Sequence, residues 1–184
     1  MMDYPVFKFV MPSSTDRKDK LRHVLRFIIT VGSYQGEIAA PTRNIEAIAV
    51  WLRSDNVRLS PSEALLAGFA ALPFKVGLPT VTRLLGLIRA KQAQRTKLLA
   101  GRYYVLDMLG VDPHLQSRGY GRLLIEEKLT AIDRERVQCY LETSDEQTIG
   151  YYQRFGFELI HRHSIESVPV HCLLRKAPAA QSLD

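Results

Sequence analysis

Residues 111–124, VDPHLQSRGYGRLL, have the residue types and spacing of an anion-binding turn. The apolar run before them predicts a strand, and the pattern after Gly119 predicts a helix. Glycine has no Cβ, so the main-chain amides around Gly119 and Gly121 can approach a ligand closely. Unpaired N–H groups at a helix start bind phosphate, because the helix dipole lies behind them, and two arginines add positive charge. Chemistry alone therefore predicts a phosphate-binding turn.

The turn differs from the two common nucleotide motifs. No Gly-Lys-Ser/Thr follows it, as a Walker loop requires, and the third glycine of the dinucleotide fingerprint is missing. The alternative is a tight strand-to-helix connection that binds nothing. The turn alone leaves both interpretations open.

Two motifs together indicate a family. QSRGYG at 116–121 matches the (Gln/Arg)-x-x-Gly-x-(Gly/Ala) pyrophosphate signature of the GNAT superfamily of N-acetyltransferases. YQRFGF at 152–157 begins 33 residues after Gly119 and resembles that family's second signature, Tyr-x-x-x-Gly-Phe. The intervening segment CYLETS is also similar. The resemblance covers about residues 103–175 and is compatible with residues 3–102.

The resemblance implies an α/β fold with a mixed, mainly antiparallel sheet, helices on both faces and a splayed central pair of strands. That pair would be 103–111 and 137–143, with acyl-CoA between them. Residues 1–184 would form a single GNAT-like domain, with a substrate-side half (1–102), an acyl-CoA-binding core (103–175) and a flexible tail (176–184). The family's first strand would precede residue 1, and the sheet edge so exposed would favour a homodimer.

The resemblance also implies that acetyl-CoA is the co-substrate. The backbone of Met108, Leu109 and Val111 would pair with the pantetheine arm, and a bulge near Met108–Leu109 would aim an N–H at the thioester oxygen. The residues expected to hold the pyrophosphate are Gln116, Ser117, Arg118, Gly119, Tyr120, Gly121 and Arg122. Asp145 and Thr148 stand where relatives carry asparagines, of which the first contacts CoA, and we expect both to lie at the cofactor. An anion at 145 would weaken binding of the anionic cofactor; the alternative for Asp145 is a helix-terminal carboxylate.

Three side chains are the candidates for proton transfer. Tyr152 takes the position of the family's general acid, which protonates the departing thiolate; the alternative is that its ring only packs. Glu142 lies where several relatives place a catalytic glutamate, and Asp107 lies on the neighbouring strand. We favour Glu142 as the base that deprotonates the amine, although Asp107 or a water chain would also serve. The alternative for either carboxylate is a structural cap or a surface charge.

The remaining helices are predicted from apolar spacing and caps. Residues 60–97 are predicted to form two helices, separated by Pro73, Gly77 and Pro79, with a Ser60–Glu63 capping box at the start. A second capping box, Ser144 with Gln147, is predicted to start a helix over 145–154. The basic helix 79–98 is interpreted as a solvated cover, or else as a lid over the acceptor site.

No metal site is predicted. His161 and His163 alternate on one predicted strand and therefore share a face, with His171 on the partner strand. Zinc uses such trios. Cys172 is expected to face away from them, so no thiol or carboxylate completes the set.

Composition narrows the class of protein. The chain has 184 residues, 46% hydrophobic and 24% charged, with a net charge of +6. No apolar run approaches a membrane span, and residues 1–18 lack a signal-peptide pattern, so we expect a cytoplasmic protein without a membrane partner. The basic residues are dispersed, so we do not expect nucleic acid as a partner. The predicted function is acetyl transfer from acetyl-CoA to a primary amine of a small molecule or peptide; the alternative is a non-catalytic acyl-CoA-binding or sensing module.

Overall fold

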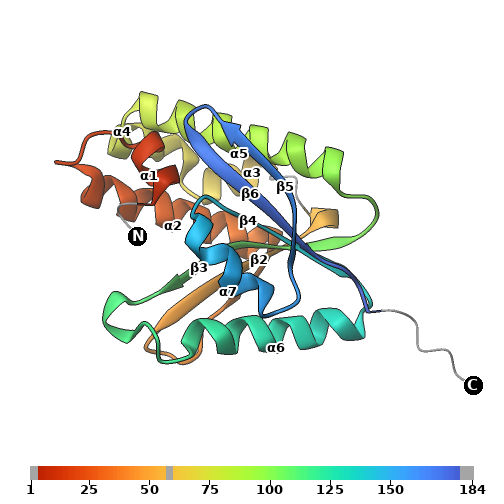
Figure 1. The fold of residues 1–184 in the computed structure, drawn as a ribbon. Coiled ribbons are helices and arrows are strands. Elements are labelled where there is room, and N and C mark those ends of the chain that lie inside the picture. Colours follow the sequence, from red (N-terminus) through yellow and green to blue (C-terminus); the bar gives the residue numbers. More distant parts are fainter. Residues whose placement is uncertain (1–3, 57–59, 179–184) are drawn as a thin grey trace, which may run out of the picture.

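The computed structural model describes residues 4–56 and 60–178, and within them six strands form one sheet in the order β1-β2-β3-β4-β6-β5. Only the central pair, β3 with β4, is parallel; the other neighbours are antiparallel. The predicted mixed, mainly antiparallel sheet is thus confirmed (Figure 1). The strands are β1 Gly36–Ala39, β2 Ala47–Arg53, β3 Tyr103–Val111, β4 Gln138–Thr143, β5 Glu158–Ile165 and β6 Val168–Arg175.

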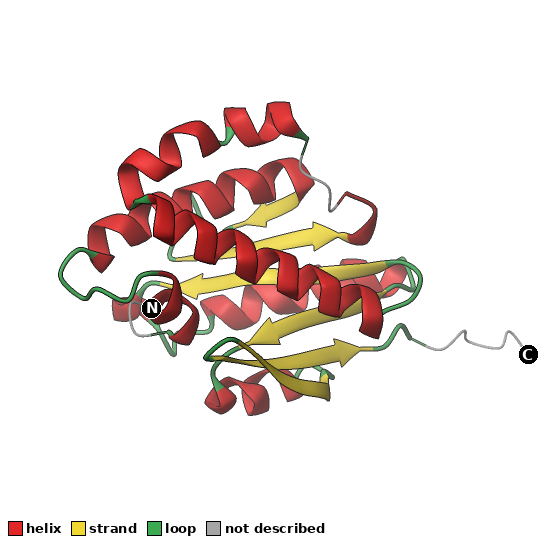
Figure 2. Cartoon of the chain, turned by 90° about the horizontal axis from the view of Figure 1, so that it is seen from above, coloured by secondary structure: helices red, strands yellow, loops and turns green. Residues whose placement is uncertain are grey.

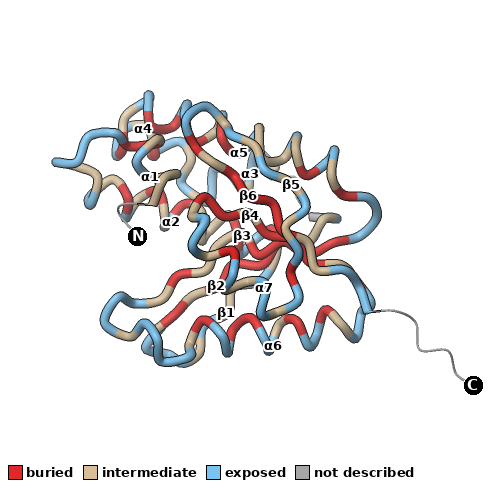
Figure 3. The backbone as a smooth tube through the Cα atoms, in the orientation of Figure 1, coloured by how far each residue is buried: buried red, intermediate tan, exposed pale blue. Residues whose placement is uncertain are grey.

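Helices cover both faces of the sheet, with α6 on one side and α5 on the other (Figure 1). Their bounds are α1 Pro5–Val10, α2 Arg17–Gln35, α3 Pro61–Leu66, α4 Leu72–Val76, α5 Leu78–Leu98, α6 Tyr120–Arg134 and α7 Ile149–Gln153. The apolar stripe of α6, including Leu124, Ile125 and Ile132, packs against Trp51 and Leu106 of the sheet. On the opposite face, α1, α2, α4 and α5 bury a second apolar cluster among themselves. Figure 3 shows the buried residues concentrated in the central strands between these layers.

The region 60–98 contains three α-helices where the sequence predicts two. The capping box is confirmed: Ser60 Oγ accepts from the Glu63 N–H at 3.2 Å, and Glu63 Oε2 accepts from the Ser60 N–H at 2.8 Å. Pro73 does not break a helix but lies in the first turn of α4, where an N–H has no helical partner to lose. Gly77, at φ 84°, separates α4 from α5.

The predicted helix over 145–154 also needs correction. Its start is a 3₁₀ turn, Glu146–Thr148, and α-helical geometry begins only at Ile149. The Ser144–Gln147 capping box is wrong, because Asp145 supplies the cap: its Oδ1 accepts from the Gln147 N–H at 3.0 Å.

The central pair of strands is splayed, as predicted. β3 and β4 pair only from Tyr103 with Gln138 to Leu106 with Leu141. Beyond these pairs β3 stays with β2 and β4 with β6, so the facing edges of the two strands separate. In Figure 2 they are the two neighbouring arrows in the middle of the sheet that point the same way and diverge. We call the end of this ladder the vertex.

A β-bulge coincides with the vertex. Val50 of β2 pairs with Met108, but Trp51 pairs with Leu106, which leaves Asp107 as the extra residue on β3. The bulge predicted near Met108–Leu109 is therefore found one residue earlier. Because a bulge bends its strand and re-aims side chains, it turns β3 away at the point where β4 also leaves.

Candidate active site

The phosphate loop, residues 116–122, leads from the end of β3 into α6. A short 3₁₀ turn, Pro113–Leu115, precedes it, and Asp112 Oδ1 caps that turn by accepting from the His114 N–H at 2.8 Å. Ser117 and Gly119 both have left-handed backbones, with φ of 62° and 87°. This pair of reversals brings the chain round into the helix with residues 116–119 exposed.

The start of α6 has the features of an anion site. No side chain of the described residues caps it, and its first turn contains no acidic residue. Its first N–H groups are therefore available to a ligand, with the positive end of the helix dipole behind them. Arg118 is exposed on the loop, whereas the Arg122 Nε donates to Glu126 at 2.8 Å.

Gly121 lies in a close contact between α6 and β3. A Cβ built on it would lie 3.2 Å from Tyr151 Oη and 3.4 Å from Val111 Cγ2. The missing side chain lets the first turn of α6 lie directly against the end of β3. Tyr120 packs against the core beside it.

Tyr152 projects from α7 with its ring partly buried. It makes edge contacts with Tyr151, at 5.3 Å between centroids, and with Phe157, at 6.2 Å. Burial raises the pKa of its phenol well above the usual value, and the nearby Tyr4 adds to the rise. The phenol therefore stays protonated at neutral pH, as a proton donor must.

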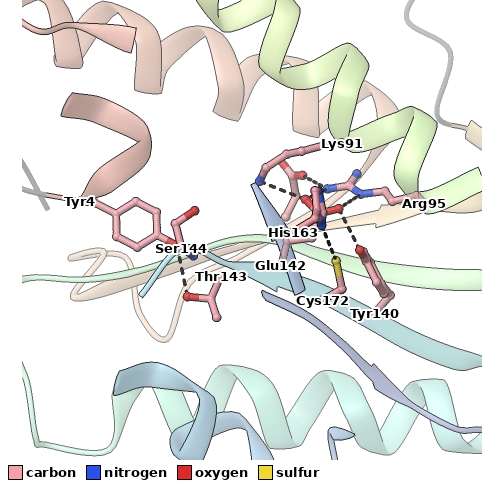
Figure 4. Close-up of polar contacts among 10 residues, drawn as sticks. Tyr4, Lys91, Arg95, Tyr140, Glu142, Thr143, Ser144, His163 and Cys172 are labelled. Carbon is pink, nitrogen blue, oxygen red and sulfur yellow. Dashed lines mark hydrogen bonds and ion pairs between the residues drawn. The ribbon is translucent and has the colours of Figure 1, made fainter. Parts of the chain in front are cut away.

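Tyr4 reaches the end of β4, a contact that sequence reasoning missed. Its hydroxyl accepts from the Ser144 N–H at 2.7 Å and lies 3.2 Å from Thr143 Oγ1 (Figure 4). Thr143 Oγ1 in turn lies 2.7 Å from Thr148 Oγ1. The N-terminal segment is thereby tied to the strand edge that β3 has left, and no periodicity in the sequence signals this.

Asp107 and Glu142 are the first residues beyond the last pair of the β3–β4 ladder, one on each strand. Arg95, from α5, joins them: its Nη2 donates to Asp107 Oδ1 at 3.1 Å, and its Nε and Nη2 donate to Glu142 Oε1 and Oε2 at 3.0 and 3.3 Å. Figure 4 shows α5 directing Arg95 and Lys91 onto Glu142. From the sequence, the two carboxylates are predicted on neighbouring strands, and the helix of Lys91 and Arg95 is interpreted as a solvated cover or a lid. The solvated cover does not hold for Arg95, whose side chain is 7% exposed.

Every acceptor position of Glu142 is occupied. In addition to Arg95, Tyr140 Oη donates to Oε1 at 3.0 Å and Lys91 Nζ lies 3.1 Å from Oε2. A carboxylate has about four lone-pair sites, and four donors fill them. The side chain is 1% exposed. Glu142 has no site left to accept a proton from an amine.

The charges around Glu142 lead to the same conclusion. Burial alone would raise the pKa of its carboxyl, but Lys91 and Arg95 outweigh burial and lower the pKa to about 2. Burial lowers the pKa of Lys91, yet Glu142, with help from Asp107 and Tyr4, raises it overall, so Lys91 stays charged. A carboxylate this acidic is a weak base, which weighs against our preference for Glu142.

Asp107 differs in one respect. Arg95 holds its Oδ1, but among the described residues no hydrogen bond reaches its Oδ2, and the side chain is 28% exposed. Asp107 therefore has a carboxylate oxygen available at the vertex, at the point where the bulge bends β3.

Asp145 and Thr148 already have partners within the chain. Asp145 caps the 3₁₀ turn, and the Thr148 hydroxyl donates to the Asp145 carbonyl at 2.7 Å. These bonds fix the connection between β4 and α7. Contact of either residue with a cofactor stays a prediction.

His161 and His163 share a face, as predicted, with ring centroids 5.3 Å apart, but His171 does not join them. A bulge between Leu159 and His161 places Cys172 opposite His161, and Cys172 Sγ lies 3.8 Å from His163 Nδ1. His171 pairs with Arg162 and so belongs to the other face. The expectation that Cys172 faces away was wrong, because strict alternation fails at a bulge. Within residues 4–56 and 60–178, no group of three or more His, Cys, Asp or Glu side chains is placed to hold a metal ion.

Comparison with known proteins agrees with this geometry. Residues 81–159 match the family model described as an acetyltransferase (GNAT) domain. The matched segment contains β3, β4, the phosphate loop and Tyr152. Residues 81–159 are thus similar to a GNAT acetyltransferase domain. The resemblance drawn from the two signatures is confirmed, and so is the fold it implied.

Solved structures show the same GNAT fold. A histone acetyltransferase HPA2 and related acetyltransferase from Corynebacterium glutamicum aligns with a TM-score of 0.60 at 16% identity, over 100% of this chain and 87% of that one. A mosquito arylalkylamine N-acetyltransferase like 5b aligns with a TM-score of 0.52 at 12% identity, over 95% and 87%. At such identities the likeness is one of fold.

A more distant match concerns a longer chain. A chain of the NatC complex bound to Gag peptide and CoA aligns with a TM-score of 0.44 at 14% identity, over 76% of this chain. This chain spans 66% of that chain. In the part of the protein that the structure describes, no helix combines the length and apolar composition needed to cross a bilayer.

Proposed function

We propose that the protein transfers an acetyl group from acetyl-CoA to a primary amine of a small molecule or peptide. The observation that carries the proposal is the parting of β3 and β4 at a vertex with two carboxylates, in a fold that also has an uncapped start of α6 and a largely buried Tyr152 phenol. The GNAT domain supports an acetyltransferase in general. The primary amine as acceptor is our inference.

Acetyl-CoA would bind along the open edge of β3. Residues 108–111 pair with β2 on one side and not with β4 on the other, so the backbone at Met108, Leu109 and Val111 has an edge for the pantetheine amides. The diphosphate would lie on the phosphate loop. The pyrophosphate ligands would be the main-chain amides of the loop, with Arg118 adding charge.

Transfer needs two proton movements. The free amine attacks the thioester carbonyl, a C–N bond forms, and the C–S bond breaks to release the CoA thiolate. We assign the proton given to the thiolate to Tyr152. We assign the amine proton to Asp107, directly or through water, in place of Glu142, because of these two carboxylates Asp107 alone has an oxygen that accepts no hydrogen bond from a described residue.

The setting of this reaction is also part of the proposal. Both cysteines, Cys139 and Cys172, are buried and free, which suits a reducing compartment, and we propose the cytoplasm. We propose that residues 1–184 act as one domain; of the predicted tail, 179–184 lie outside the described residues. Pairing of two copies along the sheet edge at β1 stays a prediction.

The test is thiol release from acetyl-CoA with a panel of primary amines, together with calorimetry of CoA binding. We expect micromolar binding and amine-dependent release, with a loss of about 100-fold in kcat/KM for Asp107→Asn. Tight CoA binding without release on any amine would instead support the acyl-CoA-binding module. Equal rates for Asp107→Asn and the native protein would exclude Asp107 as the base.

A further inference from the structure

Two charged side chains at the vertex keep hydrogen-bonding capacity that contacts with the described residues do not use. One is Asp107, whose Oδ2 accepts no hydrogen bond from a described residue. The other is Lys91, an ammonium with three N–H donors, whose only described ion pair is with Glu142 Oε2. Their side chains are 28% and 20% exposed, against 1% for Glu142 and 7% for Arg95. The solvent-facing part of the cluster is therefore one anion and one cation.

These two groups are held at fixed positions close to each other. Lys91 and Arg95 are one turn apart on α5, so both project from the same face of that helix. Lys91 contacts Glu142, and Asp107 contacts Arg95, which itself bonds to Glu142. In Figure 4, Lys91 lies on the side of Arg95 that faces Tyr4 and Ser144, toward the end of β4 that β3 has left. The pair thus flanks the region where the proposed reaction would take place.

The net charge of the cluster matters for the acceptor. Lys91 and Arg95 balance Asp107 and Glu142, so the vertex as a whole is neutral. A polycationic acceptor would bring a second and third positive charge close to Lys91, although the two carboxylates of the cluster are already balanced by Lys91 and Arg95. Like charges near a partly buried site cost more than in water. The vertex is not complementary to a polyamine.

We infer that the acceptor is an amino acid, a molecule that carries one primary amine and one carboxylate. Its ammonium would pair with Asp107 before losing a proton, and its carboxylate would accept hydrogen bonds from Lys91. This inference rests on the proposed function and names the acceptor class for the same site. The products are an N-acetylamino acid and CoA, and the acceptor's carboxylate is unchanged by the reaction.

The experiment compares matched acceptors that differ at the carboxylate alone. We assay several amino acids, each beside the amide of its carboxylate and beside its decarboxylated amine. The set includes amino acids whose amine is on the α carbon and others whose amine is farther along the side chain. In the native protein we expect kcat/KM for at least one acid to exceed that for its amide about tenfold, which corresponds to about 1.4 kcal/mol. The preference should lie mainly in KM, because Lys91 binds a group that does not react.

Variants on one helix separate the role of Lys91 from a general loss of structure. Lys91→Met should bring the ratio of kcat/KM for the acid to kcat/KM for its amide close to one. Lys91→Arg should retain much of the native preference for the acid. Lys97→Met, an exposed lysine of α5, is the matched control and should keep the native ratio. Thermal unfolding of each variant shows that it is folded.

Each outcome decides one of two questions. Amides or polyamines used as well as acids, or an acid preference that survives in Lys91→Met, would overturn the amino-acid inference while leaving acetyl transfer intact. If no acceptor reacts, the binding of amino acids to the protein with CoA bound is measured by calorimetry instead. Binding of acids that Lys91→Met abolishes would support the site and overturn catalysis; no binding of any acid would overturn the inference.

Discussion

The carboxylates of Asp107 and Glu142 are joined by one guanidinium at the point where β3 and β4 part. Each is the first residue beyond the last ladder pair on its strand, and Arg95 bonds to both. Two adjacent carboxylates would repel each other without that cation. The arrangement divides their roles: Glu142 is saturated with donors, whereas Asp107 keeps an available oxygen.

Loss of the phenol hydroxyl of Tyr152 should slow transfer. We expect Tyr152→Phe to lower kcat by about 100-fold or more, because the thiolate then lacks its proton donor, with little change in KM for acetyl-CoA. Tyr151→Phe removes the hydroxyl of the neighbouring ring and should have a much smaller effect. Steady-state kinetics on both variants measures the difference, and an unchanged kcat in Tyr152→Phe would remove this residue from the mechanism.

Neutralising Glu142 should destabilise the fold. Glu142→Gln leaves Arg95 and Lys91 without their main countercharge in a buried position, which costs about 3–5 kcal/mol when one partner of such a pair is removed. Urea unfolding measures this loss. Glu127→Gln, an exposed change on α6, is the control and should stay within about 0.5 kcal/mol of the native value. A native-like midpoint for Glu142→Gln would show that the cluster contributes little to stability.

Stability should fall in acid because of the same carboxyl. The pKa of Glu142 is lowered from 4.5 to about 2 in the folded protein. A lowered folded-state pKa adds stability that is fully present above about pH 4.5 and is lost as pH falls toward 2. The change in the free energy of unfolding is about 3 kcal/mol. Unfolding titrations between pH 6 and pH 2 should show this drop in the native protein, and a smaller drop in Glu142→Gln; equal drops would contradict the assignment.

Two glycines of similar exposure should respond oppositely to alanine. Gly119→Ala forces a side chain into φ 87°, which should lower the free energy of unfolding by about 1 kcal/mol and weaken CoA binding as the loop shifts. Gly86 lies inside α5 with nothing within 4 Å of an added Cβ, so Gly86→Ala should stabilise by up to about 1 kcal/mol. Calorimetry should give native CoA affinity for Gly86→Ala. Native affinity in Gly119→Ala would mean that the loop does not need this conformation.

Local chemistry was enough to predict the parts of the site that lie close together in the sequence. The glycines of 116–121 follow a strand and open a helix, and the backbone reversal at Gly119 requires the residue found there. The Ser60 capping box is likewise a contact over three residues. Such features depend on side-chain size, backbone freedom and hydrogen bonds between near neighbours, all of which are readable from the residues themselves.

The sequence by itself determined the order of strands and helices, the turn suited to phosphate, and which carboxylates stand on neighbouring strands. Only the tertiary structure decided their chemistry, because α5 folds back over the sheet and brings Arg95 to Glu142, 47 residues away, and Lys91 beside it. The bulge at Asp107 and the reach of Tyr4 to Ser144 are decided in the same way. The acidity of a carboxylate depends on the charges and burial around it, and those come from segments that are distant along the chain.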